Sequence, residues 1–250
     1  MKIENNIYTV TNKKKFEAIR NFKENTVMKV FDFAYEMSYG QGEHRDHRSG
    51  GNINRKNGQI FINTFQGKLA ELAIYNEFFN LSKELFNRLS KPDLDVYGLG
   101  KWDDTDLSLG VTKFSIKSTK SYGNLLLLET NDWDNNAQYK PNLQIGETSH
   151  YDYIILVRIA EDGEAIMKNN GLLYSNEVDR NRLLNIINEY IWKYDIPGYL
   201  TNSDLKNIIR NRQIIPKGAL LNGKILMDAE NYYEETGNLR DFFNLVKNFK

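Results

Sequence analysis

Residues 101–129 read KWDDTDLSLGVTKFSIKSTKSYGNLLLLE, and they contain the clearest pattern from which to predict the fold. Within this stretch, residues 105–109 and 113–117 each alternate apolar with polar side chains. Such alternation is typical of a β-strand with one buried face. Gly110 lies between the two segments and suits a tight turn. We therefore expect a short hairpin whose two strands belong to one sheet.

Two side chains of this hairpin, Asp106 and Lys117, have a clear chemical meaning. The pairing predicts that they stand near each other at the same end of the sheet. A carboxylate can hold a divalent metal, and a neighbouring ammonium group can steady a phosphate. This combination is typical of metal-dependent phosphodiester hydrolysis. Asp103, Asp104 and Asp93 are rival acids, but Asp106 begins the strand that pairs with the lysine strand.

Length and composition set the class of protein. A chain of 250 residues with 40% hydrophobic and 26% charged residues is typical of one globular domain. We expect residues 1–250 to form a single domain with an elaborated part at about 195–250. The absence of cysteine excludes disulfides and thiolate metal sites. The 33 basic and 33 acidic residues balance, so net charge says little about a nucleic-acid partner.

The periodicity along the chain predicts alternating helices and strands, and so an α/β or α+β fold. No apolar run is long enough to span a membrane, and the amino terminus lacks the apolar segment of a signal peptide. These features favour a cytoplasmic protein, and the many Asn, Lys and Ile residues favour a bacterial source. Helices are expected over 13–38, 65–89, 179–194, 203–212 and 239–249. Strands are expected over 125–128 and 151–159, with a strand pair in 218–227, and loops over 40–58, 131–150 and 195–198. Pro141 and Pro197 fall in these loops, and Pro92 and Pro216 fall in the connections after the helices 65–89 and 203–212.

Two glutamates are further candidates. Glu71 lies in the expected helix among apolar residues, and a desolvated carboxylate needs a lysine or a metal as its partner. A salt-bridged helix glutamate is the plainer alternative. Glu129 follows the apolar run 125–128 and is expected at the edge of the sheet, where a simple surface glutamate is the alternative.

The helix glutamate, acidic strand and lysine strand, here Glu71, Asp106 and Ser115–Ile116–Lys117, resemble the PD-(D/E)xK nuclease superfamily. Within it, the chain is most similar to bacterial type II restriction endonucleases. The resemblance covers about residues 65–159, and the segment 215–223, IPKGALLNG, is also similar to such enzymes. It implies a mixed central β-sheet flanked by helices, a restriction-endonuclease-like core, with Mg²⁺ at the strand ends.

The sequence departs from the family pattern at Ser115, where a second acid is expected. Serine is a poor magnesium ligand. Some members of the superfamily have serine there and take the carboxylate from farther along the chain, and Glu129 is the matching candidate. The resemblance therefore implies Mg²⁺ held by Asp106 with Glu129 or Glu71, and Lys117 acting on the water or the phosphate.

DNA contacts are expected from two polar segments. The basic, glycine-rich loop 44–56 and the expected hairpin at 217–224 could reach phosphates or base edges. A solvated linker and a solvated hairpin are the plainer alternatives. The candidate residues are Arg45, Arg48, Asn52, Asn54, Arg55 and Lys56 in the first segment, and Lys217 and Asn222 in the second.

The expected function is therefore a Mg²⁺-dependent, sequence-specific endonuclease acting on double-stranded DNA. By this resemblance we expect a homodimer, which suits palindromic sites, and a cognate DNA methyltransferase as genetic partner. A repair or structure-specific nuclease of the same fold is an alternative. The serine at position 115 also leaves open a non-catalytic DNA-binding protein, and an α/β interaction protein is the remaining class.

Overall fold

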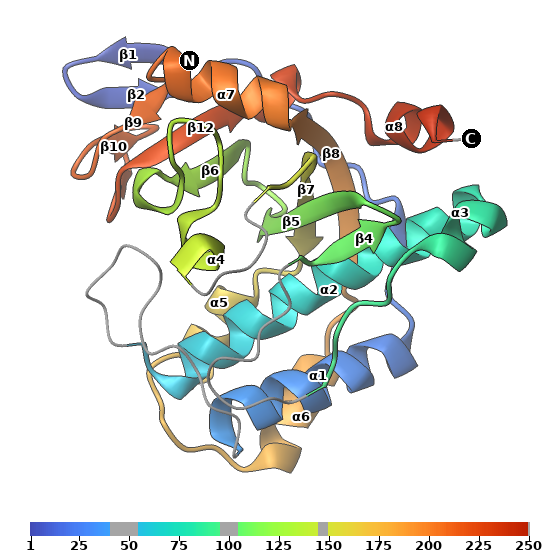
Figure 1. The fold of residues 1–250 in the computed structure, drawn as a ribbon. Helices are drawn as coiled ribbons and strands as arrows, with labels where there is room; N and C mark the ends of the chain where they lie inside the picture. The colour runs from blue at the N-terminus through green and yellow to red at the C-terminus, as the bar shows by residue number, and fades with distance from the viewer. Residues whose placement is uncertain (41–54, 96–104, 145–149, 250) are drawn as a thin grey trace.

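The computed structural model describes residues 1–40, 55–95, 105–144 and 150–249, and Figure 1 shows their arrangement. A mixed five-stranded sheet in the order β3-β8-β7-β5-β4 lies in the middle of the described fold. β5 runs parallel to β7, and the other neighbouring strands are antiparallel. The strands are β3 (Arg20–Asn21), β4 (Leu107–Leu109), β5 (Thr112–Lys120), β7 (Tyr153–Ala160) and β8 (Lys193–Thr201). The predicted mixed α/β class is confirmed.

Helices cover one face of this sheet, the lower face in Figure 1. α2 contacts β5 and β7, and α1 packs against α2. α2 is apolar around most of its circumference because it lies between the sheet and α1. The helices of this part and the C-terminal helix are α1 (Glu24–Tyr39), α2 (Asn57–Leu81), α3 (Lys83–Arg88), α5 (Gly163–Asn169), α6 (Arg180–Asn188) and α8 (Phe242–Asn248).

A second layer covers the other face, above the sheet in Figure 1. There a three-stranded sheet in the order β6-β12-β9 and the helix α7 enclose a separate apolar cluster. Its elements are β6 (Leu125–Glu129), β9 (Ile214–Ile215), β12 (Asn231–Glu235), α4 (Lys140–Gln144) and α7 (Asn202–Arg210), with short 3-10 turns at Thr130–Asp132 and Thr236–Asn238.

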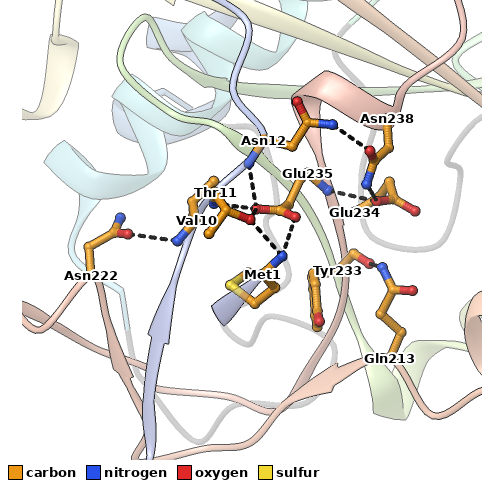
Figure 2. A network of polar contacts seen from close by, with 10 residues as sticks. All are labelled: Met1, Val10, Thr11, Asn12, Gln213, Asn222, Tyr233, Glu234, Glu235 and Asn238. Carbon is orange, nitrogen blue, oxygen red and sulfur yellow. Dashed lines mark hydrogen bonds and ion pairs between the residues drawn. The ribbon is translucent and has the colours of Figure 1, made fainter. Parts of the chain in front are cut away.

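The amino-terminal residues join this second layer. β1 (Lys2–Glu4), β2 (Ile7–Thr9), β10 (Leu220–Leu221) and β11 (Ile225–Leu226) form a four-stranded sheet. Figure 2 shows how Glu235 at the end of β12 accepts hydrogen bonds from the Met1 amino group and from the backbone N–H groups of Thr11 and Asn12. Burial alone would raise the pKa of Glu235, but these hydrogen bonds outweigh burial and lower it.

The predicted hairpin is confirmed. β4 pairs antiparallel with β5, with Leu107 opposite Phe114 and Leu109 opposite Thr112. Gly110 turns between them with φ at 61°, in the left-handed region that glycine adopts readily. Alternation over a few residues was sufficient here because hairpin partners are close in sequence.

The predicted helix over 13–38 is wrong in its first part, since α1 begins only at Glu24. The backbone carbonyls of Lys14 and Lys15 instead accept hydrogen bonds from the buried Arg158 guanidinium, at 2.8 and 2.9 Å. A helix here would direct those carbonyls along its own axis. A tertiary contact therefore overrides the local helical pattern.

The segment after α6 also differs from prediction. The expected helix 179–194 ends at Asn188, and the expected loop at 195–198 is part of the central strand β8. Pro197 is tolerated there because the β7–β8 register shifts between Leu156 and Arg158, and a bulge leaves a residue unpaired. The boundary proposed for an elaborated C-terminal part, residue 195, thus falls inside the central sheet.

Several other elements agree with prediction in kind and differ at their ends, and the expected helix 65–89 corresponds to α2 and α3. The expected loop 131–150 is wrong in part, because residues 140–144, which include Pro141, form the helix α4. The elements α5, β1, β2, β9 and β12 were not predicted. Residues 125–128 do form a strand, but β6 belongs to the three-stranded sheet and not to the central one. The hairpin of β10 and β11 matches the strand pair predicted in 218–227. α7 begins at Asn202 and is capped by Thr201, whose side chain accepts from the N–H of Asp204, rather than by Ser203. No helix in the described ranges is both long and apolar enough to cross a membrane.

Candidate functional site

The candidate site is built on the edge of the central sheet where β4 begins. Extending the β4–β5 register by one residue sets Asp106 opposite Ser115. The Asp106 carboxylate accepts a hydrogen bond from the backbone N–H of Ile116 at 2.5 Å. This bond continues the ladder beyond β4, because a side-chain oxygen replaces a backbone carbonyl. It brings the carboxylate to the residue directly before Lys117.

Lys117 occupies the face of β5 that points away from α2. It aligns with Leu156 of β7, whose side chain belongs to the apolar cluster of the second layer. The Lys117 ammonium lies 5.8 Å from the centre of the Tyr139 ring, within range of a cation–π interaction. Tyr139 packs on the same cluster, so the aromatic ring supports a half-buried lysine at the sheet surface.

The serine that replaces the expected acid is fully enclosed. Ser115 is 1% exposed and aligns with Ile154 of β7. Asp106 and Lys117 form no ion pair with each other in the described part of the chain; Asp106 bonds to a backbone amide and Lys117 lies over a ring. The predicted hairpin thus sets Asp106, directly before β4, beside the strand that carries Lys117, but each side chain contacts a different partner: Asp106 contacts Ile116, and Lys117 contacts Tyr139.

Glu129 lines the same groove as the far end of β5, and neither Lys117 nor Asp106 is among the residues that line it. Glu129 ends β6 opposite Asn231 of β12. Together with Ser118, Thr119 and Lys120 of β5, it lines a groove of about 600 Å³ between the central sheet and the second layer. Two sheets are thus needed to bring this glutamate and the end of β5 to one groove.

A charged network that sequence reasoning missed borders the same groove. The Lys120 ammonium pairs with Asp162 at 3.3 Å and with Glu164 at 2.8 Å. The Tyr122 hydroxyl donates to Asp162 at 2.7 Å. Burial alone would lower the pKa of Lys120, but the hydrogen bonds to Glu164 and Tyr122 and the charge of Asp162 outweigh it and raise the pKa. The only sequence signal was Asp162 as a helix cap, which does not indicate a lysine 42 residues earlier.

Glu71 lies in α2 and has a lysine partner. Its carboxylate is buried and pairs with Lys68 at 2.8 Å. The Lys68 ammonium also lies 5.5 Å from the centre of the Phe33 ring, which belongs to α1. The pair therefore adjoins the α1–α2 contact, in agreement with the salt-bridged alternative for this glutamate.

The residues that could bind a metal are distributed over these elements. In the ranges that the structure describes, no three Asp, Glu or His side chains converge as a ready metal cluster. Asp93 accepts a hydrogen bond from the N–H of Asp95 at 2.8 Å, as in an Asx turn. Asp103 and Asp104 lie outside the described residues. Asp106 keeps one carboxylate oxygen beyond its bond to Ile116, and Mg²⁺ is often held by one or two carboxylates together with substrate phosphates.

The predicted DNA contacts are only partly described. Arg45, Arg48, Asn52 and Asn54 lie outside the described residues. Arg55 is half-buried and Lys56 is exposed immediately before α2. Lys217 is exposed.

Asn222 has a structural role. Its side-chain oxygen accepts from the N–H of Val10 at 3.0 Å, and its φ is 50° in the β10–β11 turn. This bond, drawn in Figure 2, engages the oxygen that a bidentate contact to adenine would need, whereas a phosphate would be contacted by the side-chain NH2 group.

Comparison with family models, with curated proteins and with solved structures found no match to this chain.

Proposed function

We propose that this protein is a Mg²⁺-dependent endonuclease that hydrolyses phosphodiester bonds of double-stranded DNA at specific sequences, as bacterial type II restriction enzymes do. The observation that carries the proposal is the contact between the Asp106 carboxylate and the backbone amide of Ile116. It joins the candidate metal acid to the strand that presents Lys117. The mixed sheet with helices on one face is compatible with the fold that the resemblance implies.

In this proposal each residue has one task. The remaining oxygen of Asp106 would hold Mg²⁺, which when bound neutralises phosphate charge and acidifies a coordinated water. Lys117 would hold the phosphate or accept the proton of the attacking water, and the Tyr139 ring supports its ammonium on the face of β5 that points away from α2.

Glu129 is the better candidate for the second carboxylate. It lines a groove with three residues of β5, while Glu71 is paired with Lys68 beside α1. Ser115 is too enclosed to serve as a ligand for a solvated ion. We therefore assign the auxiliary acid to Glu129 in the proposal.

The test is cleavage of unmodified phage DNA by the purified chain with and without Mg²⁺, followed on a gel. We expect discrete fragments with Mg²⁺ and a loss of rate of roughly 10²–10⁴-fold in Lys117→Ala, the usual range for a group that transfers a proton. Lys193→Ala is the matched control, because Lys193 is also a half-buried strand lysine but starts β8, away from β5. Cleavage by Lys117→Ala at the wild-type rate would refute the proposal.

A non-catalytic DNA-binding protein is the second candidate. It is favoured by the buried serine at position 115 and by the lack of a three-ligand cluster among the described residues. Salt-sensitive binding of duplex DNA with no Mg²⁺-dependent cutting would support it. Irregular products in place of discrete fragments would favour a repair or structure-specific nuclease.

The proposal includes two partners. A homodimer would match a palindromic target, and a DNA methyltransferase with the same target would protect the host genome. Light scattering of the purified protein tests the dimer.

A further inference from the structure

Helix α7 has a buried face and a cationic face. Leu205, Ile208 and Ile209 are buried in the apolar cluster of the second layer. The opposite side of the same segment carries Lys206 and Arg210, four residues and about one turn apart. Asn207 and Asn211 are exposed beside them, and Arg212 follows the helix directly.

The three cations are available to a partner. Lys206, Arg210 and Arg212 are exposed, and none pairs with a carboxylate in the part of the chain that the structure describes. Unpaired cations retain their full charge for binding an anion.

The neighbouring acids reduce this charge little. The Asp204 carboxylate accepts two hydrogen bonds from Arg240, at 2.7 and 2.8 Å, so this pair is neutral. Glu234 is the remaining acid on the rim of the shallow depression that Asn207 and Asn211 line. The positive charge of Lys206, Arg210 and Arg212 is thus a local feature of this surface, since the whole chain has a formal net charge of zero.

α7 lies on the same side of the central sheet as Lys117. The apolar side of α7 and the Tyr139 ring next to Lys117 pack on one cluster. In Figure 1, α7 lies above the sheet and α1 and α2 lie below it. β8, which α7 contacts, is two strands from β5 in the sheet order. At about 4.8 Å per strand, β8 and β5 are roughly 10 Å apart within the sheet.

We infer that the outward face of α7 binds the phosphate backbone of duplex DNA through Lys206 and Arg210, with Arg212 at its end. The inference rests on the proposed function, because it names the surface that holds the same substrate. Cations on one helix face match the regular negative charge of a duplex, and contact with them releases condensed counterions. Asn207 can add hydrogen bonds to phosphate or to base edges.

The test measures DNA affinity apart from cleavage. Fluorescence anisotropy of a labelled duplex in EDTA is followed over a series of salt concentrations for the wild type and for Lys206→Ala/Arg210→Ala. Each lost phosphate contact lowers the slope of log K against log salt by about 0.9, so we expect a decrease of about 1.8. At about 0.15 M salt, this corresponds to a roughly 30-fold weaker affinity.

The matched control is Lys23→Ala/Lys29→Ala. It removes the same charge from exposed lysines at the start and on the surface of α1, on the other face of the sheet. The control is expected to bind as the wild type does, and thermal melting verifies that all variants fold. Equal losses in both double variants would overturn the inference and show a general charge effect.

Two further outcomes separate this inference from the proposed function. DNA binding and cutting that are unchanged in the α7 variant would overturn the inference alone. A wild-type protein that binds no DNA at any salt concentration would overturn both.

Discussion

Arg158→Met should destabilise the protein more than any surface substitution. Arg158 lies in β7 and is 1% exposed. Its guanidinium donates to both carboxylate oxygens of Asp195, at 2.8 and 2.5 Å. It also donates to the carbonyls of Lys14 and Lys15 at 2.8 and 2.9 Å. One side chain thus joins two strands of the central sheet to the amino-terminal segment.

The magnitude follows from what remains after the substitution. Removing one partner of a buried ion pair costs about 3–5 kcal/mol, because the other charge stays buried without compensation. The two carbonyls also lose their donor, although water can reach them once the segment loosens. We expect a loss of about 4 kcal/mol from a total stability on the order of 5–15 kcal/mol.

Urea unfolding followed by circular dichroism measures this loss. With a slope of about 3 kcal/mol/M, the midpoint should fall by roughly 1.3 M. Arg180→Met is the control, because the ion pair of Arg180 with Asp32 is exposed, at 43% and 54%, and such pairs contribute about 1 kcal/mol at most.

The double variant Arg158→Met/Asp195→Leu should recover part of the loss, since it leaves no uncompensated charge. It should not recover all of it, because the carbonyls of Lys14 and Lys15 still lack their donor. A midpoint for Arg158→Met within about 0.3 M of the wild type, less than 1 kcal/mol at this slope, would refute the reasoning.

Three further predictions concern single contacts. The hydrogen bond from Arg240 lowers the pKa of Asp204 to about 2. The stability that this ion pair contributes is therefore complete above the unfolded pKa near 4 and is lost as the pH falls from about 4 through 2. In urea unfolding, Arg240→Gln should be less stable than the wild type by about 1 kcal/mol at pH 6 and equally stable near pH 2. The Glu77 side chain is 1% exposed and accepts hydrogen bonds from the Tyr194 hydroxyl at 2.7 Å and from Arg20 at 2.8 Å. Glu77→Ala should therefore lower the free energy of unfolding by about 2–3 kcal/mol, and Glu77→Gln should lower it less. Equal losses in the two variants would contradict the hydrogen-bond argument. Gly110→Ala should lower the melting temperature by a few degrees, equivalent to about 1 kcal/mol, because φ at this position is 61°. An unchanged melting temperature would mean that the turn rearranges at no cost.

The candidate site could be predicted from sequence only where its parts are local. Asp106 and Lys117 are eleven positions apart and joined by one tight turn, so alternation and a glycine were enough to predict that they lie near each other. Glu129 required the pairing of β6 with β12, whose strands are about a hundred residues apart. The Lys120 network and the cationic face of α7 depend in the same way on which distant acids lie nearby.

Local patterns in the sequence were enough to predict the α/β class, the β4–β5 hairpin and β7, because these depend on periodicity within one segment. A helix was also predicted where α2 lies, but α2 begins eight residues before the predicted start at residue 65. The tertiary structure was needed to show that residues 193–201 form a central strand through Pro197 and that residues 13–19 form no helix. The physical reason is the same in both cases. A bulge between β7 and β8 accommodates the proline, and the buried Arg158 needs the carbonyls of Lys14 and Lys15, so distant partners outweigh the local preference.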